Sequence, residues 1–177
     1  MIKVIKIGNL IYQNIEPKHI DENGNEIWNP NIPQDIDSLK SCFKDTLDWL
    51  TTRHINQKLQ EIQEDLSDIS TEQSWLEGVF YSQGLDPNQI KAEITKVVLG
   101  QEDVNTAITN LAIPDELVDN FNRAVEIAKI IAWKEQVWKT ETQLEAQIDA
   151  VTDIDELLLF DVNKLCEEAY NQIPLEV

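Results

Sequence analysis

Two prolines, Pro30 and Pro33, separate two parts of the chain whose apolar residues repeat at different intervals. Before the prolines, residues 2–28 contain short β-rich runs, and after them apolar residues recur about every 3.6 residues. A repeat of two is the period of a strand, whereas a repeat of about 3.6 is the period of a helix. The sequence therefore predicts a mainly α protein, with a β-rich N-terminal appendage and linker at 1–34 and a helical body at 35–177.

The appendage is predicted to contain hairpins. The runs IKVIKI and LIYQNI flank Gly8-Asn9, a Gly-X pair suited to a type II′ turn. Asn23-Gly24 follows between two further apolar residues and is predicted to form a two-residue hairpin turn with positive φ at both positions. Together these runs predict a β-hairpin or a meander of three or four strands. Such a small sheet cannot bury enough apolar area alone, so it must pack on the helices or on another chain.

The second turn has an alternative interpretation as a calcium loop, with oxygen ligands from Asp21, Asn23 and Asn25. An EF-hand loop requires Gly at its sixth position and a bidentate Glu at its twelfth. Counted from Asp21, these positions hold Glu26 and Ile32. The mismatch at both places favours the hairpin, and the sequence predicts no metal site.

The helical body is predicted to contain four segments. Its apolar repeat predicts one long helix at 35–69 and a second at 114–150, where no Gly and no further Pro interrupts the chain. Between them, 70–113 is divided by glycines and by an Asp-Pro cap, which indicates short helices. The last segment, 151–177, is expected to form short C-terminal helices. The natural arrangement is a long antiparallel helical hairpin with the short helices of 70–113 at its turn.

The second long helix carries two apolar stripes, about 100° apart around its axis. Either the helix is buried among other helices of its own chain, or its second stripe faces a neighbouring subunit, and the sequence leaves both open. Tryptophan is enriched at the centres of protein interfaces because it removes a large area from water. The subunit hypothesis predicts a homo-oligomer with these interface residues: Trp28, Ile130, Trp133, Val137 and Trp138.

The acidic composition limits the possible partners. With 33 Asp and Glu against 14 Lys and Arg, the net charge is −19. This charge argues against binding to nucleic acid or to an anionic membrane, because both require compensating cations. A basic protein partner remains possible. A hydrophobic content of 42% with five Trp is too high for a disordered acidic tail, so the charge is expected to coat a folded protein.

The chain shows no membrane-spanning or secretory signal. No segment reaches the roughly 18 apolar residues that span a bilayer, and the start, MIKVIKIGNLIYQ, lacks the apolar region of a signal peptide. The two cysteines, Cys42 and Cys166, lie on apolar helical stripes and are expected to be reduced core thiols. Whether they lie near each other stays open. The sequence predicts a soluble protein made in a cytoplasm.

Few residues are available for catalysis. The two histidines, His19 and His54, belong to no zinc-binding spacing, and His54 is expected on a helix surface. No phosphate-binding glycine loop and no nucleophile elbow appears. The acidic repeat within 61–68 predicts a solvated helix face or, alternatively, a docking strip for a Lys- or Arg-rich partner. We therefore expect no enzyme, no catalytic residue and no cofactor.

The order of the parts resembles a family of bacteriophage proteins. A β-rich N-terminus with the hairpin DENGNEIW, a Pro-broken linker and a helical body ending in LEAQIDAVTDIDELLLFDVNKLCEEAY is similar to the small accessory proteins of phage tail gene clusters. Tail-fibre assembly and baseplate-associated proteins are the most similar in style. The resemblance implies a virion structural part or an assembly chaperone that contacts other tail proteins, often as an oligomer, in the virion or the host cytoplasm.

A hypothesis of a different class is an acidic inhibitor that mimics DNA by presenting carboxylates in place of phosphates. The charge of −19 supports it. The distribution of the acidic residues along every predicted helix counts against it, because a mimic concentrates them on one face.

Overall fold

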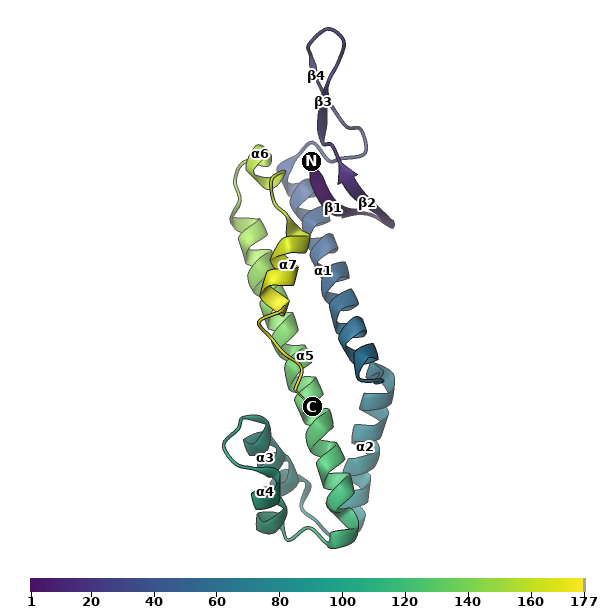
Figure 1. Cartoon of the computed structure of the whole chain (residues 1–177), viewed down its shortest axis with the longest axis vertical. Coiled ribbons are helices and arrows are strands. Elements are labelled where there is room, and N and C mark those ends of the chain that lie inside the picture. The colour runs from purple at the N-terminus through teal and green to yellow at the C-terminus, as the bar shows by residue number, and fades with distance from the viewer. Residues whose placement is uncertain (177) are drawn as a thin grey trace. The chain divides into compact units, whose positions relative to one another are not determined.

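The computed structural model describes residues 1–176 and consists mainly of helices that follow four short strands (Figure 1). The strands are β1 (Ile2–Ile7), β2 (Leu10–Ile15), β3 (Lys18–Ile20) and β4 (Glu26–Trp28). The helices are α1 (Ile36–Glu61), α2 (Leu66–Ser82), α3 (Pro87–Val98), α4 (Val104–Leu111), the 3₁₀ turn η1 (Asp115–Leu117), α5 (Val118–Ala150), α6 (Ile154–Leu157) and α7 (Val162–Tyr170). The predicted fold class, mainly α with an N-terminal β-hairpin, is confirmed. None of the helices within these 176 residues combines the length and the apolar character needed to cross a bilayer.

The chain divides into two compact units. Unit 1 contains Met1–Ile55 and Gln136–Ile173, and unit 2 contains Asn56–Glu135 with the residues from Pro174 onward. Helices α1 and α5 supply residues to both units, because the boundaries fall inside them. The predicted division at residue 34 is therefore not a boundary between the compact units.

The hairpin of β1 and β2 is antiparallel, with pairs that run from Ile7 opposite Leu10 to Ile2 opposite Ile15. Gly8 at the turn has a φ of +59°. A type II′ turn requires this left-handed conformation at its first central position, where a Cβ would be strained. The predicted turn is confirmed, and it sets the register of the hairpin.

The four strands form two separate two-stranded sheets and not one meander. The second sheet pairs β3 with β4. Near the end of β2, Asn14 leaves the extended conformation with a φ of +51°, and Pro17, which lies between the sheets, has no N–H to donate to a neighbouring strand. These two residues explain why β3 does not continue the sheet of β2.

The loop between β3 and β4 is longer than the predicted two-residue turn. Its first turn closes with a 3.0 Å hydrogen bond from Gly24 N to the Asp21 carbonyl, and Gly24 has a φ of +82°. The Asp21 carboxylate accepts hydrogen bonds from Asn25 N at 2.7 Å and from Asn23 N at 2.9 Å. These bonds, those from Asn25 foremost, lower the pKa of Asp21. The prediction of positive φ at Asn23 was wrong, because a type I turn followed by one left-handed glycine makes the reversal.

The helix predicted at 35–69 is interrupted, because α1 ends and α2 begins within it. Gln63 adopts a φ of +60°, and its N–H donates to the Gln60 carbonyl at 3.1 Å. Glu64 N–H donates to the Leu59 carbonyl at 2.9 Å. This pair of bonds is a Schellman cap, which ends a helix on a left-handed residue. The prediction was wrong because Gln occupies the position where Gly is usual.

Asp65 begins the next helix. Its carboxylate accepts a hydrogen bond from Ser67 N at 2.8 Å and so caps α2. The second long helix, predicted at 114–150, is observed as the turn η1 followed by α5. The absence of Gly and Pro after Pro114 therefore predicted one long helix correctly, whereas the same absence before Gly78 did not exclude a break.

In unit 1 the β1–β2 hairpin packs on helices, as its small size requires. β1 contacts α7, and Ile2 and Ile5 are fully buried. Lys6 N donates to Thr46 Oγ1 of α1 at 2.7 Å. Lys6 precedes Ile7, which forms the closing pair of the hairpin with Leu10, so the Lys6 N–H points away from β2. The bond to Thr46 therefore gives a partner to an N–H on the outer edge of β1.

The parts of α1 and α5 that belong to unit 1 run in opposite directions. Near the start of α1, Lys40 donates to the Asp149 carbonyl at 2.7 Å and Lys44 pairs with the Asp149 carboxylate at 2.6 Å. Further along α1, Thr51 contacts Glu141, which lies earlier in α5. Both helices carry buried apolar side chains in this unit, among them Leu39, Phe43 and Leu47 on α1 and Leu144 and Ile148 on α5.

Candidate protein-binding face

The predicted interface residues do not share one surface. Ile130, Trp133 and Val137 are 1%, 5% and 0% exposed within the single chain. They are buried in the core of the single chain, so they offer no exposed surface for the subunit contact that the sequence predicted. Two stripes of α5 are apolar because the rest of the same chain covers them both. Trp138 is 46% exposed and remains accessible.

Trp28 is half-buried and has a local structural role. Its indole Nε1 donates to the Ile32 carbonyl at 2.7 Å, which ties the end of β4 to the linker. The Lys18 ammonium lies 5.3 Å from the centroid of the indole ring. The pKa of Lys18 is raised by its bonds to Asp155 and Glu26, at 2.7 and 3.1 Å.

Helix α2 exposes two aromatic side chains that the sequence analysis did not assign to a surface. Trp75 is 58% exposed and Tyr81 is 73% exposed. The buried stripe of the same helix consists of Ile69, Leu76 and Phe80. At about 100° per residue, Trp75, Gly78 and Tyr81 follow one ridge of the helix, and Gly78 lies about 180° from the centre of the buried stripe. We call these three residues the Trp75–Tyr81 face.

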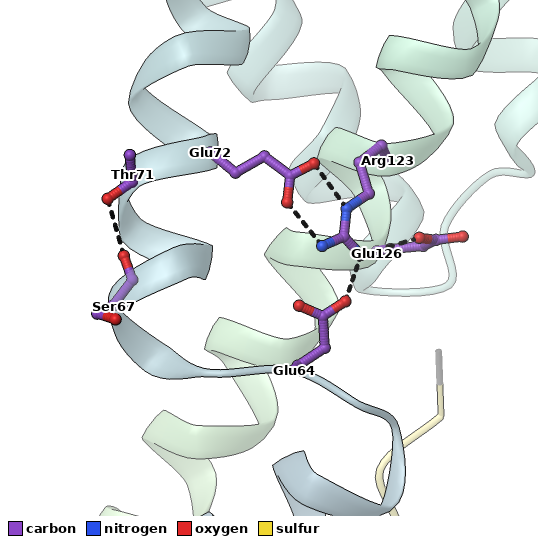
Figure 2. A network of polar contacts seen from close by, with 6 residues as sticks. All are labelled: Glu64, Ser67, Thr71, Glu72, Arg123 and Glu126. Carbon is purple, nitrogen blue, oxygen red and sulfur yellow. Dashed lines mark hydrogen bonds and ion pairs between the residues drawn. The ribbon is translucent and has the colours of Figure 1, made fainter.

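Arg123 on α5 holds α2 in place within unit 2 (Figure 2). Its Nε and Nη2 donate to the two carboxylate oxygens of Glu72 at 3.0 and 2.7 Å, a bidentate pair. Its Nη1 lies 2.8 Å from Glu64 in the loop before α2 and 3.3 Å from Glu126 on α5. The guanidinium lowers the pKa of Glu72, and the carboxylates, Glu72 first, raise the pKa of Arg123.

The bidentate pair fixes the rotation of α2 about its own axis. Figure 2 shows Glu72 extending toward Arg123, while Ser67 and Thr71 lie on the side of α2 that points away from α5. At about 100° per residue, Gly78 lies within about 20° of both Ser67 and Thr71 around the helix. The Trp75–Tyr81 face is therefore directed away from α5.

Replacing Arg123 with Met should lower the free energy of unfolding by about 1–2 kcal/mol, because Glu64 and Glu72 lose their cation. The expected effect is smaller than for a fully buried pair, since the Glu72 side chain is 35% exposed and water screens it. The pKa of Glu72 is lowered in the folded state, so ionised Glu72 contributes to stability at pH values above the usual pKa of a glutamate. This contribution is lost as the pH falls through the lowered pKa.

Thermal and urea unfolding at several pH values would measure this difference. The gap between the wild type and Arg123→Met should narrow as the pH falls below the usual pKa of a glutamate. Lys91→Met removes the same charge from an exposed position of α3 and serves as the control. Equal melting temperatures for the two variants at neutral pH would show that the network contributes nothing.

All the charged side chains of α2 are negative. Its sequence, LSDISTEQSWLEGVFYS, contains three acidic residues and no Lys or Arg. Glu72 is engaged by Arg123, whereas Asp68 and Glu77 are exposed. The Trp75–Tyr81 face thus combines two exposed aromatic rings with a negative surrounding, which suits a cationic and partly apolar partner.

The acidic repeat within 61–68 does not form one strip. Glu61 closes α1 and pairs with Lys58 at 2.7 Å, Glu64 binds Arg123, and Asp65 caps α2. Because the helix breaks within the repeat, these residues lie in different structural contexts. The hypothesis of a continuous docking strip was wrong.

A second group of carboxylates joins α3 to the loop before α4. Glu93 pairs with Lys96, and the Asn110 amide lies 3.3 Å from Glu93 and 3.5 Å from Glu102. A hydrogen bond between the two carboxyl groups raises the pKa of Glu102, and the same bond together with Lys96 lowers the pKa of Glu93 to about 2. The opposite directions of these two pKa shifts favour protonation of Glu102 before Glu93 as the pH falls.

We expect Glu102→Gln to raise the melting temperature at pH 7, because an amide can donate to Glu93 without adding a second negative charge. In the wild type, the pKa of Glu102 is raised in the folded state, so protonated Glu102 contributes to stability at low pH. This contribution is lost as the pH rises through the raised pKa. The advantage of the variant should therefore shrink as the pH falls toward 4.5, the usual pKa of the group. Glu77→Gln, which removes the same charge from an exposed site of α2, is the control, and identical pH profiles for both variants would contradict the raised pKa of Glu102.

The buried polar groups of unit 1 stabilise packing. Thr51 Oγ1 lies 2.5 Å from the Tyr170 hydroxyl, and the ring of Tyr170 lies 5.0 Å from that of His54. His54 is half-buried, so its predicted place on a helix surface was wrong, whereas His19 is exposed on β3. Burial raises the pKa of Cys166 to about 12, which keeps the thiol protonated and unreactive at neutral pH. Cys42, half-buried on α1, is also a free cysteine, and burial raises its pKa too.

Comparison of this chain with protein-family models, with curated proteins and with solved structures finds no match.

Proposed function

We propose that this chain is a non-enzymatic structural or assembly protein of a bacteriophage tail, a component of the tail fibre or baseplate or the chaperone of one, that acts through protein contacts. The observation that carries the proposal is the Trp75–Tyr81 face, where two exposed aromatic residues lie on a helix fixed by Arg123. Aromatic side chains of this kind form the energetic centres of protein interfaces. The order of the parts along the sequence, which resembles tail accessory proteins, supplies the context.

The arrangement of the carboxylates favours this function over the mimicry of DNA. A mimic presents its carboxylates to the partner as a regular array of free charges. In this chain several carboxylates are used within the fold: Asp65, Asp86, Asp103, Asp153 and Asp161 cap helices. Glu64 and Glu72 bind Arg123. These internal roles break up the array that mimicry requires.

The experiment is quantitative mass spectrometry of phage particles and of assembly intermediates made in the host, with a tagged form of this chain. We expect the chain to purify together with tail proteins, and we expect the double variant Trp75→Ala with Tyr81→Ala to lose that association. Trp138→Ala, which removes an exposed Trp from α5, should retain it. Recovery of a nuclease or repressor as the stoichiometric partner, in place of tail proteins, would support the mimic and overturn the proposal.

A further inference from the structure

Gly78 is a residue that the fold of this chain does not require. It lies inside α2, its φ is not positive, and a Cβ added there would meet nothing within 4 Å. A glycine in a helix interior is destabilising relative to alanine, because glycine loses more backbone freedom on folding. Within the described chain no close approach and no special backbone conformation offsets this cost.

The two exposed aromatic residues lie on either side of this glycine. Trp75 precedes Gly78 by three residues and Tyr81 follows it by three, so each ring is a neighbour of the glycine along the same ridge. The absence of a side chain at Gly78 leaves a notch between two large side chains that are 58% and 73% exposed. The notch faces away from the buried stripe of α2.

A notch of this shape fits another helix. Helices pack with ridges in grooves at axial distances of about 8–10 Å, and the distance is set by the side chains at the crossing point. Glycine at that point permits a closer approach, and the rings on each side can then cover the apolar residues of the partner. The surrounding charge selects the partner, because α2 has no Lys or Arg while Asp68 and Glu77 are exposed on it.

We infer that the Trp75–Tyr81 face binds a cationic amphipathic helix of a partner protein, with a small residue of that helix over Gly78 and its Lys or Arg residues near Asp68 and Glu77. This inference rests on the proposed function, protein binding, and specifies the class of partner. A second copy of this chain is a poorer occupant, because two acidic α2 helices would repel each other.

The test uses the whole chain and a synthetic helical peptide of about 20 residues, which spans about 30 Å. The peptide carries Leu on one stripe, Ala at its centre and Lys on the flanks, and a second peptide has Glu in place of every Lys. Calorimetry at physiological salt and the shift of the Gly78 amide in NMR spectra would report binding. We expect saturable binding of the Lys peptide, no binding of the Glu peptide, and a shift that maps to α2.

Three variants separate the notch from general electrostatic attraction. Gly78→Leu and Trp75→Ala should each lower the affinity for the Lys peptide at least tenfold. Gly78→Ala should also lower this affinity, while it raises the melting temperature of the free protein. Gln73→Leu, an exposed position of α2 outside the face, and Trp138→Ala are the controls and should bind as the wild type does.

Equal binding of the Lys peptide to the wild type and to Gly78→Leu would overturn the inference, as would equal binding of the two peptides or self-association through this face. These results are independent of the particle experiment. If tail proteins still require Trp75 and Tyr81 while the peptide does not bind at Gly78, only the class of partner is wrong. If tail proteins do not associate at all, the proposed function is wrong.

Discussion

Replacing Trp133 with Ser and Val137 with Asp in the same chain should abolish folding. Both side chains are buried, at 5% and 0% exposure. Truncating a buried Trp costs about 3–5 kcal/mol, and an unpaired carboxyl group at a buried position costs several more. The sum is comparable to the 5–15 kcal/mol that typically separates a folded domain from its unfolded state. Circular dichroism should show a loss of helical signal at 25 °C.

A matched pair of substitutions at exposed positions provides the control. Trp138→Ser with Lys139→Asp makes similar changes at the next residues of α5, where both side chains are exposed, and should leave the helical signal intact. If the Trp133 and Val137 variant stayed helical and only its mass in solution fell, the two residues would face a subunit after all. Since burial within one chain accounts for both stripes of α5, the expectation of a homo-oligomer loses its main basis.

Phe121→Ala should destabilise unit 2 by about 3–5 kcal/mol, as expected for a buried ring replaced by a cavity. Phe121 is fully buried, and its ring meets that of Phe80 in an edge-to-face contact with centroids 6.4 Å apart. Urea titration would give the change in unfolding free energy, and a double-mutant cycle with Phe80→Ala should yield a coupling of about 0.5–1.5 kcal/mol. Additive effects would mean that the two rings do not stabilise each other.

Phe121→Leu preserves most of the volume and apolar character of the side chain, so its effect should be clearly smaller than that of Phe121→Ala. A similar loss for both variants would indicate that the shape of the ring, and not the cavity, determines the cost.

The parts of the fold that could be predicted depend on residues whose backbone preferences are strong. Gly8 set the type II′ turn because few other residues adopt positive φ without strain. Pro87 after the capping Asp86 located the start of α3 in the same way. The break after α1 could not be predicted, because Gln63 adopts the left-handed conformation only where the Schellman bonds and the cap at Asp65 compensate it.

The candidate face was missed for a different reason. Trp75, Leu76 and Phe80 all contribute to the apolar character of one short run, and an apolar run does not show which of its sides is covered. The signal that was available is the spacing of Ile69, Leu76 and Phe80, which defines the buried stripe and leaves Trp75 outside it. To predict which residues of α5 are buried and which are exposed, the positions of the surrounding helices must be known, and the local sequence pattern does not contain them.

The contact between β1 and α7 has a consequence for how the protein is made. These two elements are separated by roughly 155 residues, so the ribosome needs about 8–30 seconds after completing β1 to deliver the helix that contacts it. Residues 56–135, which form most of unit 2, emerge as one uninterrupted piece during that interval. These residues can therefore begin to fold during synthesis, before β1 has made its contact with α7.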